Sequence, residues 1–157
     1  MYRPIPTYRG FVYPWHMDHV GHMNVQFYVA RFDEATWQFL AALGLTPAFL
    51  REQGCSAVAA DQHTCYRREV LAGTPLHVAT ELLALGRTSL RFVHRMYDSA
   101  TDEEVASTEL VGVYFDLARR RSAALPDVVH ARALALLPPP ATPARWPLDA
   151  SDPAPPG

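Results

Sequence analysis

The sequence has few cysteines and no long apolar run. Its 157 residues include two cysteines, Cys55 and Cys65, and on one extended strand these thiols would lie far beyond disulfide distance. We therefore expect both thiols to be reduced. Residues 1–10 lack the apolar core and the small-residue cleavage site of a signal peptide, and no stretch approaches the roughly 18 consecutive apolar residues of a membrane span. These absences predict a cytoplasmic protein.

Charge and motif content argue against several other functions. The chain has 14 basic and 16 acidic residues and a net charge of −2, which gives no support to a nucleic-acid partner or to charge-driven membrane recruitment. It has neither a P-loop nor a G-x-G-x-x-G motif, so the usual nucleotide cofactors are not indicated. The histidines His16, His19 and His22 lie on one loop without a nearby cysteine or an H-E-x-x-H pattern, and we expect no metal there.

A long amphipathic helix is the clearest local feature. In the segment NVQFYVARFDEATWQFLAALG, residues 24–44, apolar side chains recur at helical spacing and form one stripe. Asn24 is a good N-cap, and Gly44 is a good residue to end the helix. Trp37 lies off the stripe, so we expect this helix to be covered on more than one side. The stripe consists of Val25, Tyr28, Val29, Phe32, Ala35, Phe39, Leu40 and Leu43.

Strand-like segments lie on both sides of this helix in the sequence. One precedes the helix, and four follow a short helical segment at residues 48–54, with turn residues between them. This order predicts an α+β fold in which an antiparallel sheet of about five strands wraps around one long central helix. The expected strands are residues 10–15, 55–69, 75–85, 88–97 and 105–117.

The C-terminal part differs in composition from the rest of the chain. Residues 128–137 have the pattern of a short helix, which the prolines at 138–140 would stop. The segment that follows is rich in proline, and such a composition cannot form a packed core. We therefore expect one domain at residues 1–137 and an extended or disordered tail at residues 138–157.

The loop before the long helix concentrates polar chemistry. Asp18 lies in this loop, and Gly21 allows the loop to turn sharply. A helix that begins near Asn24 presents unpaired backbone N–H groups, which can polarise a carbonyl and hold an oxyanion. A carboxylate beside such a site is suited to acyl transfer to water. The residues leave a simpler alternative open, in which Asp18 caps the helix or pairs with a histidine.

The segment HMDHVGHMNVQFYVARFDEA, residues 16–35, resembles hotdog-fold acyl-CoA thioesterases of the 4-hydroxybenzoyl-CoA thioesterase type. These proteins have a D-x-D-x-x-G-H-x-N-N-like signature, followed by an aromatic residue and an F-E-like pair. The resemblance covers roughly residues 8–118 and predicts a hotdog fold, in which the sheet wraps around the helix. The matching positions are Asp18, Gly21, His22, Asn24, Tyr28, Phe32, Asp33 and Glu34.

The resemblance implies an acyl-CoA thioesterase that needs no cofactor. Asp18 would act as nucleophile or general base on the thioester carbonyl, and the backbone N–H of Val25 would polarise that carbonyl. Members of the family have active sites at subunit interfaces, so we expect a homodimer or a homotetramer. The resemblance and the residues near the helix start together predict substrate contacts from His16, Gly21, His22, Asn24, Tyr28 and His63.

Two positions depart from the family signature. His16 replaces its first acidic residue, and Val25 replaces its second asparagine. Neither change removes Asp18, but both alter the surroundings of the acyl group, which the sequence does not identify. If the strand at residues 55–69 lines a neighbouring subunit's site, as the resemblance implies, His63 or Asp61 would face the acyl group. The alternative is that His63 is a hydrogen-bonded strand histidine.

Two arginine pairs are candidates for binding the phosphates of coenzyme A. Arg67 and Arg68 end one expected strand, and Arg119 and Arg120 end another. The guanidinium group is suited to phosphate, although a run of charges is more often a solvated surface. Either pair is therefore a candidate site for the nucleotide end of the substrate.

Two other functions stay open beside the thioesterase. A hotdog hydratase or dehydratase acting on acyl thioesters would pair a carboxylate with a histidine across the interface, and it would make His22 or His63 indispensable. A non-catalytic acyl-CoA-binding protein would bind without turnover, which the intact Asp18 disfavours. The sequence thus favours an acyl-CoA thioesterase without a nucleic-acid or membrane partner.

Overall fold

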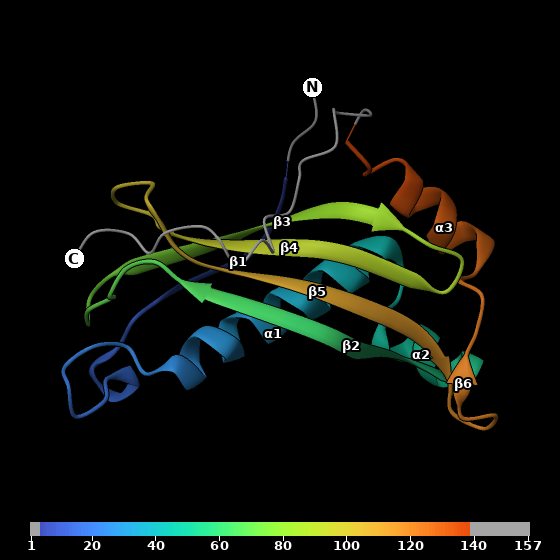
Figure 1. Ribbon diagram of the computed structural model, residues 1–157, viewed down its shortest axis with the longest axis horizontal. Helices are drawn as coiled ribbons and strands as arrows, with labels where there is room; N and C mark the ends of the chain where they lie inside the picture. Colours follow the sequence, from blue (N-terminus) through green and yellow to red (C-terminus); the bar gives the residue numbers. More distant parts are fainter. Residues whose placement is uncertain (1–3, 139–157) are drawn as a thin grey trace, which may run out of the picture.

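The computed structural model describes residues 4–138, which form one antiparallel sheet curled around a long helix (Figure 1). The sheet order is β1-β3-β4-β5-β2, with the short β6, Arg121–Ser122, paired to β5, so β1 and β2 are the two long edges. This is the predicted α+β layout. Apart from Pro138, the predicted tail lies outside the described residues. The long strands are β1 Ile5–Phe11, β2 Cys55–Tyr66, β3 Pro75–Leu85, β4 Ser89–Asp98 and β5 Glu104–Asp116.

Helix α1, Val25–Leu43, is the predicted long helix and has the predicted ends. The Asn24 side chain accepts a hydrogen bond from the Gln26 N–H at 3.0 Å, which satisfies one of the free donors of the first turn. Gly44 follows the last turn with a φ of 94°, a conformation that favours glycine. The buried side chains of α1 are Tyr28, Phe32, Ala35, Phe39, Leu40 and Leu43.

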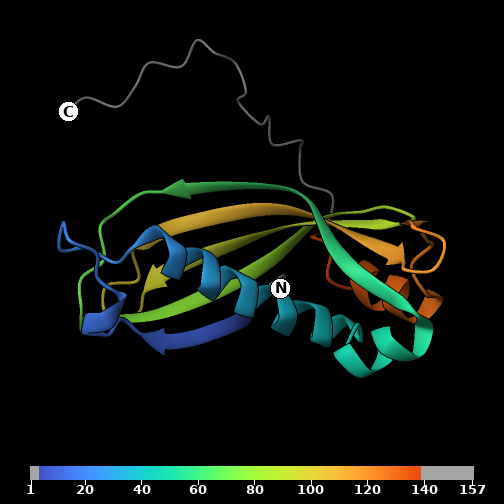
Figure 2. The same ribbon diagram turned by 90° about the horizontal axis from the view of Figure 1, so that it is seen from below.

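Helix α1 covers only part of the inner face of the sheet. It packs chiefly over β1 and β3, and Figure 2 shows β2 arching away from it at the opposite edge. Trp37 is 40% exposed, so the second covered side that we expected is not found within one chain. A small apolar pocket lies between α1 and β2. Its lining includes Thr36, Leu40, Ala59 and Gly112.

The first strand differs from the prediction. It is Ile5–Phe11 and not residues 10–15, because the chain turns into a short 3-10 helix, η1, at Pro14–His16. Pro14 has no N–H to donate to a strand ladder, and its fixed φ suits the first position of a helix. The consequence is that the segment predicted as a strand instead brings His16 against the start of α1.

The shorter elements lie at the far end of the sheet. Helix α2, Pro47–Gln53, agrees with the first short helix expected, whereas α3, Asp127–Leu134, ends three residues before the expected limit at residue 137. Strand β6, Arg121–Ser122, was not expected. It forms because Arg120, with a φ of 53°, turns the chain back onto β5, and left-handed backbone at a non-glycine residue gives no clear sequence signal.

Candidate active site

The loop before α1 is a narrow hairpin. Met17 and Met23 form an isolated bridge, the Asp18 N–H donates to the His22 carbonyl at 2.9 Å, and the Gly21 N–H donates to the Asp18 carbonyl at 3.2 Å. Gly21 has a φ of 97°, which a residue with a Cβ rarely adopts. Gly21 therefore closes the turn that holds Asp18.

Asp18 is anchored by loop amides and does not cap α1. Its Oδ1 accepts hydrogen bonds from the N–H groups of Val20 at 2.9 Å and Gly21 at 3.2 Å. Desolvation raises the pKa of the Asp18 carboxyl, but hydrogen bonds from the backbone of Val20, His22 and Gly21 outweigh it, so the pKa lies below its ordinary value. Asp18 is therefore a carboxylate at neutral pH, held in one orientation.

The first turn of α1 leaves one backbone donor unused. The Gln26 N–H donates to the Asn24 side chain at 3.0 Å, and the Phe27 N–H donates to the Asn24 carbonyl at 2.9 Å. No hydrogen bond recorded within residues 4–138 uses the N–H of Val25. This donor, with the positive end of the helix dipole, can stabilise a developing oxyanion.

His16 packs against the start of α1. It is 4% exposed, its Nδ1 accepts from the Tyr13 N–H at 3.0 Å, and its carbonyl accepts from the Asn24 N–H at 2.9 Å. Its ring lies 4.5 Å from that of Phe27, centroid to centroid. Burial and the nearby Arg31 guanidinium lower the pKa of His16. The structure thus gives His16 intramolecular partners, and its predicted contact with substrate stays a prediction.

The segment after β2 completes the surroundings of the helix start. The His22 Nε2 lies 3.0 Å from Glu69 Oε2, and the Tyr28 hydroxyl donates to the Arg68 carbonyl at 3.3 Å. The rings of Tyr28 and Tyr66 meet nearly at right angles, with centroids 5.2 Å apart. Burial is the main cause that raises the pKa of Tyr28 to about 12, so its hydroxyl stays a donor. Tyr66 and Glu69 were missed by sequence reasoning.

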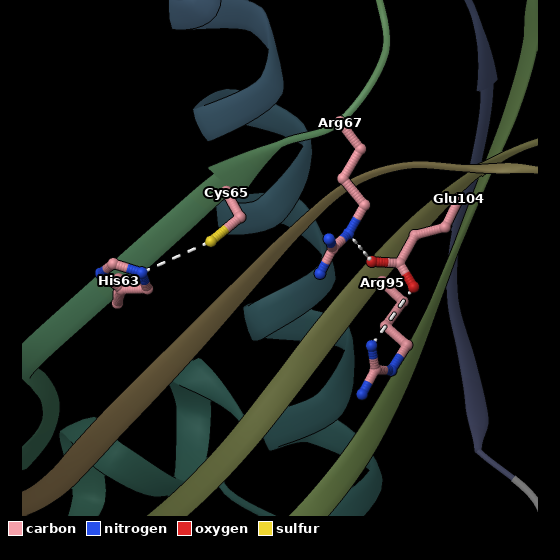
Figure 3. Close-up of polar contacts among 5 residues, drawn as sticks. All are labelled: His63, Cys65, Arg67, Arg95 and Glu104. Carbon is pink, nitrogen blue, oxygen red and sulfur yellow. Dashed lines mark hydrogen bonds and ion pairs between the residues drawn. The ribbon is translucent and has the colours of Figure 1, made fainter. Parts of the chain in front are cut away.

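His63 lies on the other face of the sheet. Figure 3 shows His63 and Cys65 side by side on the face turned away from α1, with His63 Nε2 3.4 Å from the Cys65 Sγ. The strand alternates, so Thr64 and Tyr66 face the helix side instead. The structure therefore does not bring His63 together with Asp18 in one chain, and its contact with an acyl group stays a prediction.

Three of the four candidate CoA-binding arginines have carboxylate partners. The Arg67 Nε lies 2.6 Å from Glu104 Oε1 (Figure 3), and the Arg68 Nη2 lies 3.1 Å from Glu103 Oε1. Their charges are therefore partly neutralised within the chain.

The second arginine pair lies in the turn between β5 and β6. The Arg119 Nη1 is 3.1 Å from Asp116 Oδ2, whereas the Arg120 guanidinium lies over the Phe115 ring at 5.5 Å. This turn is at the opposite end of the sheet from the start of α1 (Figure 1). One chain alone therefore does not place Arg119 and Arg120 beside Asp18.

The described part of the chain has neither a cluster of metal ligands nor a membrane-spanning helix. Within residues 4–138, no group of three or more His, Cys, Asp or Glu side chains is placed to hold a metal ion. No helix in that part of the chain combines the length and apolar content needed to cross a bilayer.

Known thioesterases resemble this chain in sequence. The family model of the thioesterase-like superfamily matches residues 12–133. The chain is also 30% identical over 136 residues to a betainyl-CoA thioesterase of Pseudomonas aeruginosa, with 87% of this chain and 86% of that protein covered. The chain belongs to the thioesterase-like superfamily. The member described here is thus a thioester hydrolase, as the sequence predicted.

Solved structures confirm the hotdog fold of this thioesterase-like protein. A Staphylococcus aureus protein in complex with CoA has a TM-score of 0.83 at 18% identity, covering 98% of this chain and 96% of that chain. A 1,4-dihydroxy-2-naphthoyl-CoA thioesterase from Synechocystis has a TM-score of 0.73 at 16% identity, covering 82% and 95%. The predicted wrapping of an antiparallel sheet around one long helix is therefore confirmed.

Proposed function

We propose that this thioesterase-like protein is an acyl-CoA thioesterase in which Asp18 is the catalytic carboxylate and the Val25 N–H is the oxyanion donor. The observation that carries the proposal is the pairing of an ionised, anchored carboxylate in the loop with an unused donor at the helix start. The two free cysteines, Cys55 and Cys65, support a reducing, cytoplasmic location for it.

Two routes are open to the carboxylate. In the covalent route, an Asp18 oxygen attacks the thioester carbonyl, the C–S bond breaks, coenzyme A leaves as thiolate, and water then hydrolyses the mixed anhydride. In the general-base route, Asp18 takes a proton from water, and the hydroxide forms the new C–O bond before the thiolate leaves and is protonated. In both routes the Val25 N–H faces the carbonyl oxygen as it becomes negative.

Isotope labelling separates these routes. In a single turnover in H₂¹⁸O, the covalent route gives a first product that carries an unlabelled oxygen from Asp18 whenever water attacks the enzyme carbonyl, and it leaves ¹⁸O in the Asp18 carboxyl. The general-base route puts ¹⁸O directly into the product acid and none into the protein. Mass spectrometry of the peptide that contains Asp18 distinguishes them.

A second copy of the chain is proposed to complete the site. β2 is an edge strand, and edge strands are templates for further pairing. β2 begins at Cys55, opposite Asp116 of β5, and ends at Tyr66, beside the start of α1. Antiparallel pairing of two β2 strands would thus bring the partner's Arg119 and Arg120 toward this chain's helix start. We propose a homodimer of this kind, or a homotetramer built from it.

Hybrid dimers test this assembly. Sedimentation should give at least twice the chain mass. Coexpression of the Asp18→Asn chain with the Arg119→Ala/Arg120→Ala chain should yield hybrids that hold one site with both native contributions. We expect such hybrids to be more active at low acyl-CoA concentration than either parent, and no recovery would contradict the sharing of residues between subunits.

The acyl group is proposed to be small and cationic. The relative from Pseudomonas aeruginosa is a betainyl-CoA thioesterase, and a quaternary ammonium is attracted to aromatic faces. The right-angled pair Tyr28 and Tyr66, with Glu69 nearby, offers such a surface at the helix start. The apolar pocket at Thr36 lies about 16 Å along the helix from Val25, which is beyond the length of a short acyl group.

Hydrolysis of three thioesters tests this proposal. Betainyl-CoA and 3,3-dimethylbutyryl-CoA have nearly the same shape but differ in charge, and dodecanoyl-CoA is long enough to reach the apolar pocket. With a thiol reagent as the readout, we expect betainyl-CoA to have the highest kcat/KM. Preference for dodecanoyl-CoA would assign the pocket to the acyl chain instead. Hydration of an enoyl-CoA without thiol release, or binding without turnover over hours, would favour the hydratase or the binding protein.

A further inference from the structure

A chain of hydrogen-bonded side chains crosses the buried side of the sheet and reaches α1. The His94 Nδ1 lies 2.6 Å from the Thr80 Oγ1, which lies 2.7 Å from the Thr7 Oγ1. On its other side, the His94 Nε2 lies 2.8 Å from the Thr36 Oγ1 of α1. His94 is fully buried, and Thr7 and Thr80 are at most 4% exposed. The chain thus links β1, β3, β4 and the central helix.

Counting donors fixes the direction of each bond. The Thr36 hydroxyl donates to the Phe32 carbonyl at 2.9 Å, so it has no proton left for His94 and accepts from the His94 Nε2–H. The His94 Nδ1 of the neutral ring then accepts from Thr80, and Thr80 accepts from Thr7. Burial lowers the pKa of His94 to about 3. The imidazole is therefore neutral and in one tautomer at physiological pH.

This polar chain divides the core into two apolar clusters. The His94 ring stacks on Phe32 of α1 with centroids 6.1 Å apart, and it meets Phe92 edge to face at 5.2 Å. One cluster lies toward the start of α1 and includes Tyr28, Phe32 and Met96. The other lies toward its end and includes Phe39, Phe92, Leu43 and Leu82.

The apolar stripe of α1 does not by itself fix how far along the sheet the helix lies. Phe32 and Phe39 are seven residues apart, two turns on the same face, and apolar packing is not directional. A buried polar residue, by contrast, can specify register because any shift leaves its partner unpaired. The hydrogen bond of Thr36 with His94 joins the buried side of α1 to the sheet, whereas Arg31, nearer the helix start, contacts Tyr8 of β1 at a partly buried position.

We propose that His94 is a positioning residue: through Thr36 it sets the axial register of α1 against the sheet. It thereby places the Val25 N–H relative to Asp18 and Tyr66. The catalytic part of this inference rests on the proposed function. Val25 is eleven residues from Thr36, so it lies about 16 Å along a stiff helix, and a misplacement of about 1 Å at a reacting centre can cost about 10²-fold in rate.

The test replaces the polar link with apolar side chains of similar size. In the double variant Thr36→Val/His94→Leu no donor of this link is left unpaired in α1. Thr80 loses His94 as its acceptor, but it can donate to Thr7, which then donates to the Val78 carbonyl at 3.3 Å. We therefore expect the variant to be about as resistant to urea as the wild type. We expect its kcat to fall at least about tenfold while its KM changes less than about twofold. Thr36→Ser keeps the hydroxyl and should keep kcat near the wild-type value.

Thr108→Val is the matched control. Thr108 is also fully buried on the inner face, but its hydroxyl contacts Thr64 and Gln62 of β2, and the backbone of His63, and not α1. This variant should therefore lose stability without the selective fall in kcat. An equal fall in kcat for Thr108→Val and for the double variant would overturn the inference.

Crystal structures of the wild type and the double variant give a readout that does not depend on activity. We expect α1 to be displaced along its axis in the double variant. An unmoved α1 overturns the inference, and so does a displaced α1 with unchanged kcat. If the wild type hydrolyses no acyl-CoA, the proposed function fails, but the position of α1 still decides whether His94 sets its register.

Discussion

The rings of Tyr28 and Tyr66 meet edge to face, with centroids 5.2 Å apart and planes at 83°. Tyr28 belongs to the first turns of α1, and Tyr66 is the last residue of β2. Tyr28 is 4% exposed, whereas Tyr66 is 48% exposed. The Tyr28 ring is therefore fixed by packing, and the Tyr66 ring is accessible to a ligand. The contact therefore connects the start of the helix to the end of the edge strand.

Replacing the exposed Tyr66 ring should weaken the binding of cationic substrates selectively. Tyr66→Leu keeps apolar area but removes the negative face of the ring, so we expect the KM for betainyl-CoA to rise about 5- to 30-fold. The KM for 3,3-dimethylbutyryl-CoA should change less than about twofold. Tyr66→Phe keeps the ring and is the control. Equal losses for both substrates would show that Tyr66 acts through shape alone.

Asp18→Asn should remove catalysis and leave the fold intact. The amide oxygen can still accept from the N–H groups of Val20 and Gly21, but it is neither a base nor a nucleophile, so we expect kcat to fall about 10²- to 10⁴-fold. Because the pKa of Asp18 is lowered, the acid limb of the pH profile of wild-type kcat/KM should lie below the ordinary aspartate range.

Asp127→Asn is the control for Asp18→Asn, because Asp127 lies on α3 at the far end of α1. Turnover near wild type in Asp18→Asn would rule out the assigned role.

His94 should make the folded state sensitive to acid. Its pKa is about 3 in the folded state against an ordinary value of 6.5, so protons bind the unfolded chain first as pH falls. The stabilisation is complete above pH 6.5 and is lost between pH 6.5 and pH 3, at about 1.4 kcal/mol per pH unit. We expect the free energy of unfolding in urea to fall by about 2 kcal/mol between pH 6.5 and pH 4.5 from this group.

The double variant Thr36→Val/His94→Leu isolates this contribution. It lacks the imidazole, so its unfolding free energy should decrease less steeply than that of the wild type over the same pH range. Parallel curves for the two proteins would mean that other groups cause the acid sensitivity.

Gly44 and Gly54 both have a positive φ, but they differ in the space that surrounds an added Cβ. Gly44 ends α1 with a φ of 94°, and an added Cβ would meet the Arg132 guanidinium, whereas Gly54 has a φ of 62° and no atom within 4 Å of that position. We expect Gly54→Ala to cost about 1 kcal/mol and Gly44→Ala to cost about 2 kcal/mol or more. Chemical denaturation measures both costs. A smaller cost at Gly44 would mean that Arg132 and the backbone adjust without strain.

The limits of α1 and β3 could be predicted because the residues that set them lie within each element or directly beside it. The limits of α1 follow from the cap at Asn24, the apolar stripe and Gly44, and β3 has the predicted limits Pro75–Leu85. The family signature also directed attention to Asp18, although its catalytic role stays a proposal. Helical periodicity and capping depend on neighbours within a few residues, so they can be seen without the fold.

The sequence did not show which side chains of β2 face inward, because the strand contains a bulge. The register of β2 against β5 shifts between Ala59 and Asp61, so the alternation before the bulge does not predict the alternation after it. This shift places Tyr66 beside α1 and turns His63 to the outer face. The sequence predicts a substrate contact for His63, which stays a prediction, and it gives no signal for Tyr66.

The sequence by itself determined the central helix, the class of fold and the polar loop at Asp18, because these depend on local spacing. Only the tertiary structure decided which residues surround the helix start and what holds the helix in place. Glu69 approaches His22, and His94 reaches Thr36, across 47 and 58 positions of the chain. Such contacts depend on how the strands pair and bulge, and this information is distributed over the whole sheet.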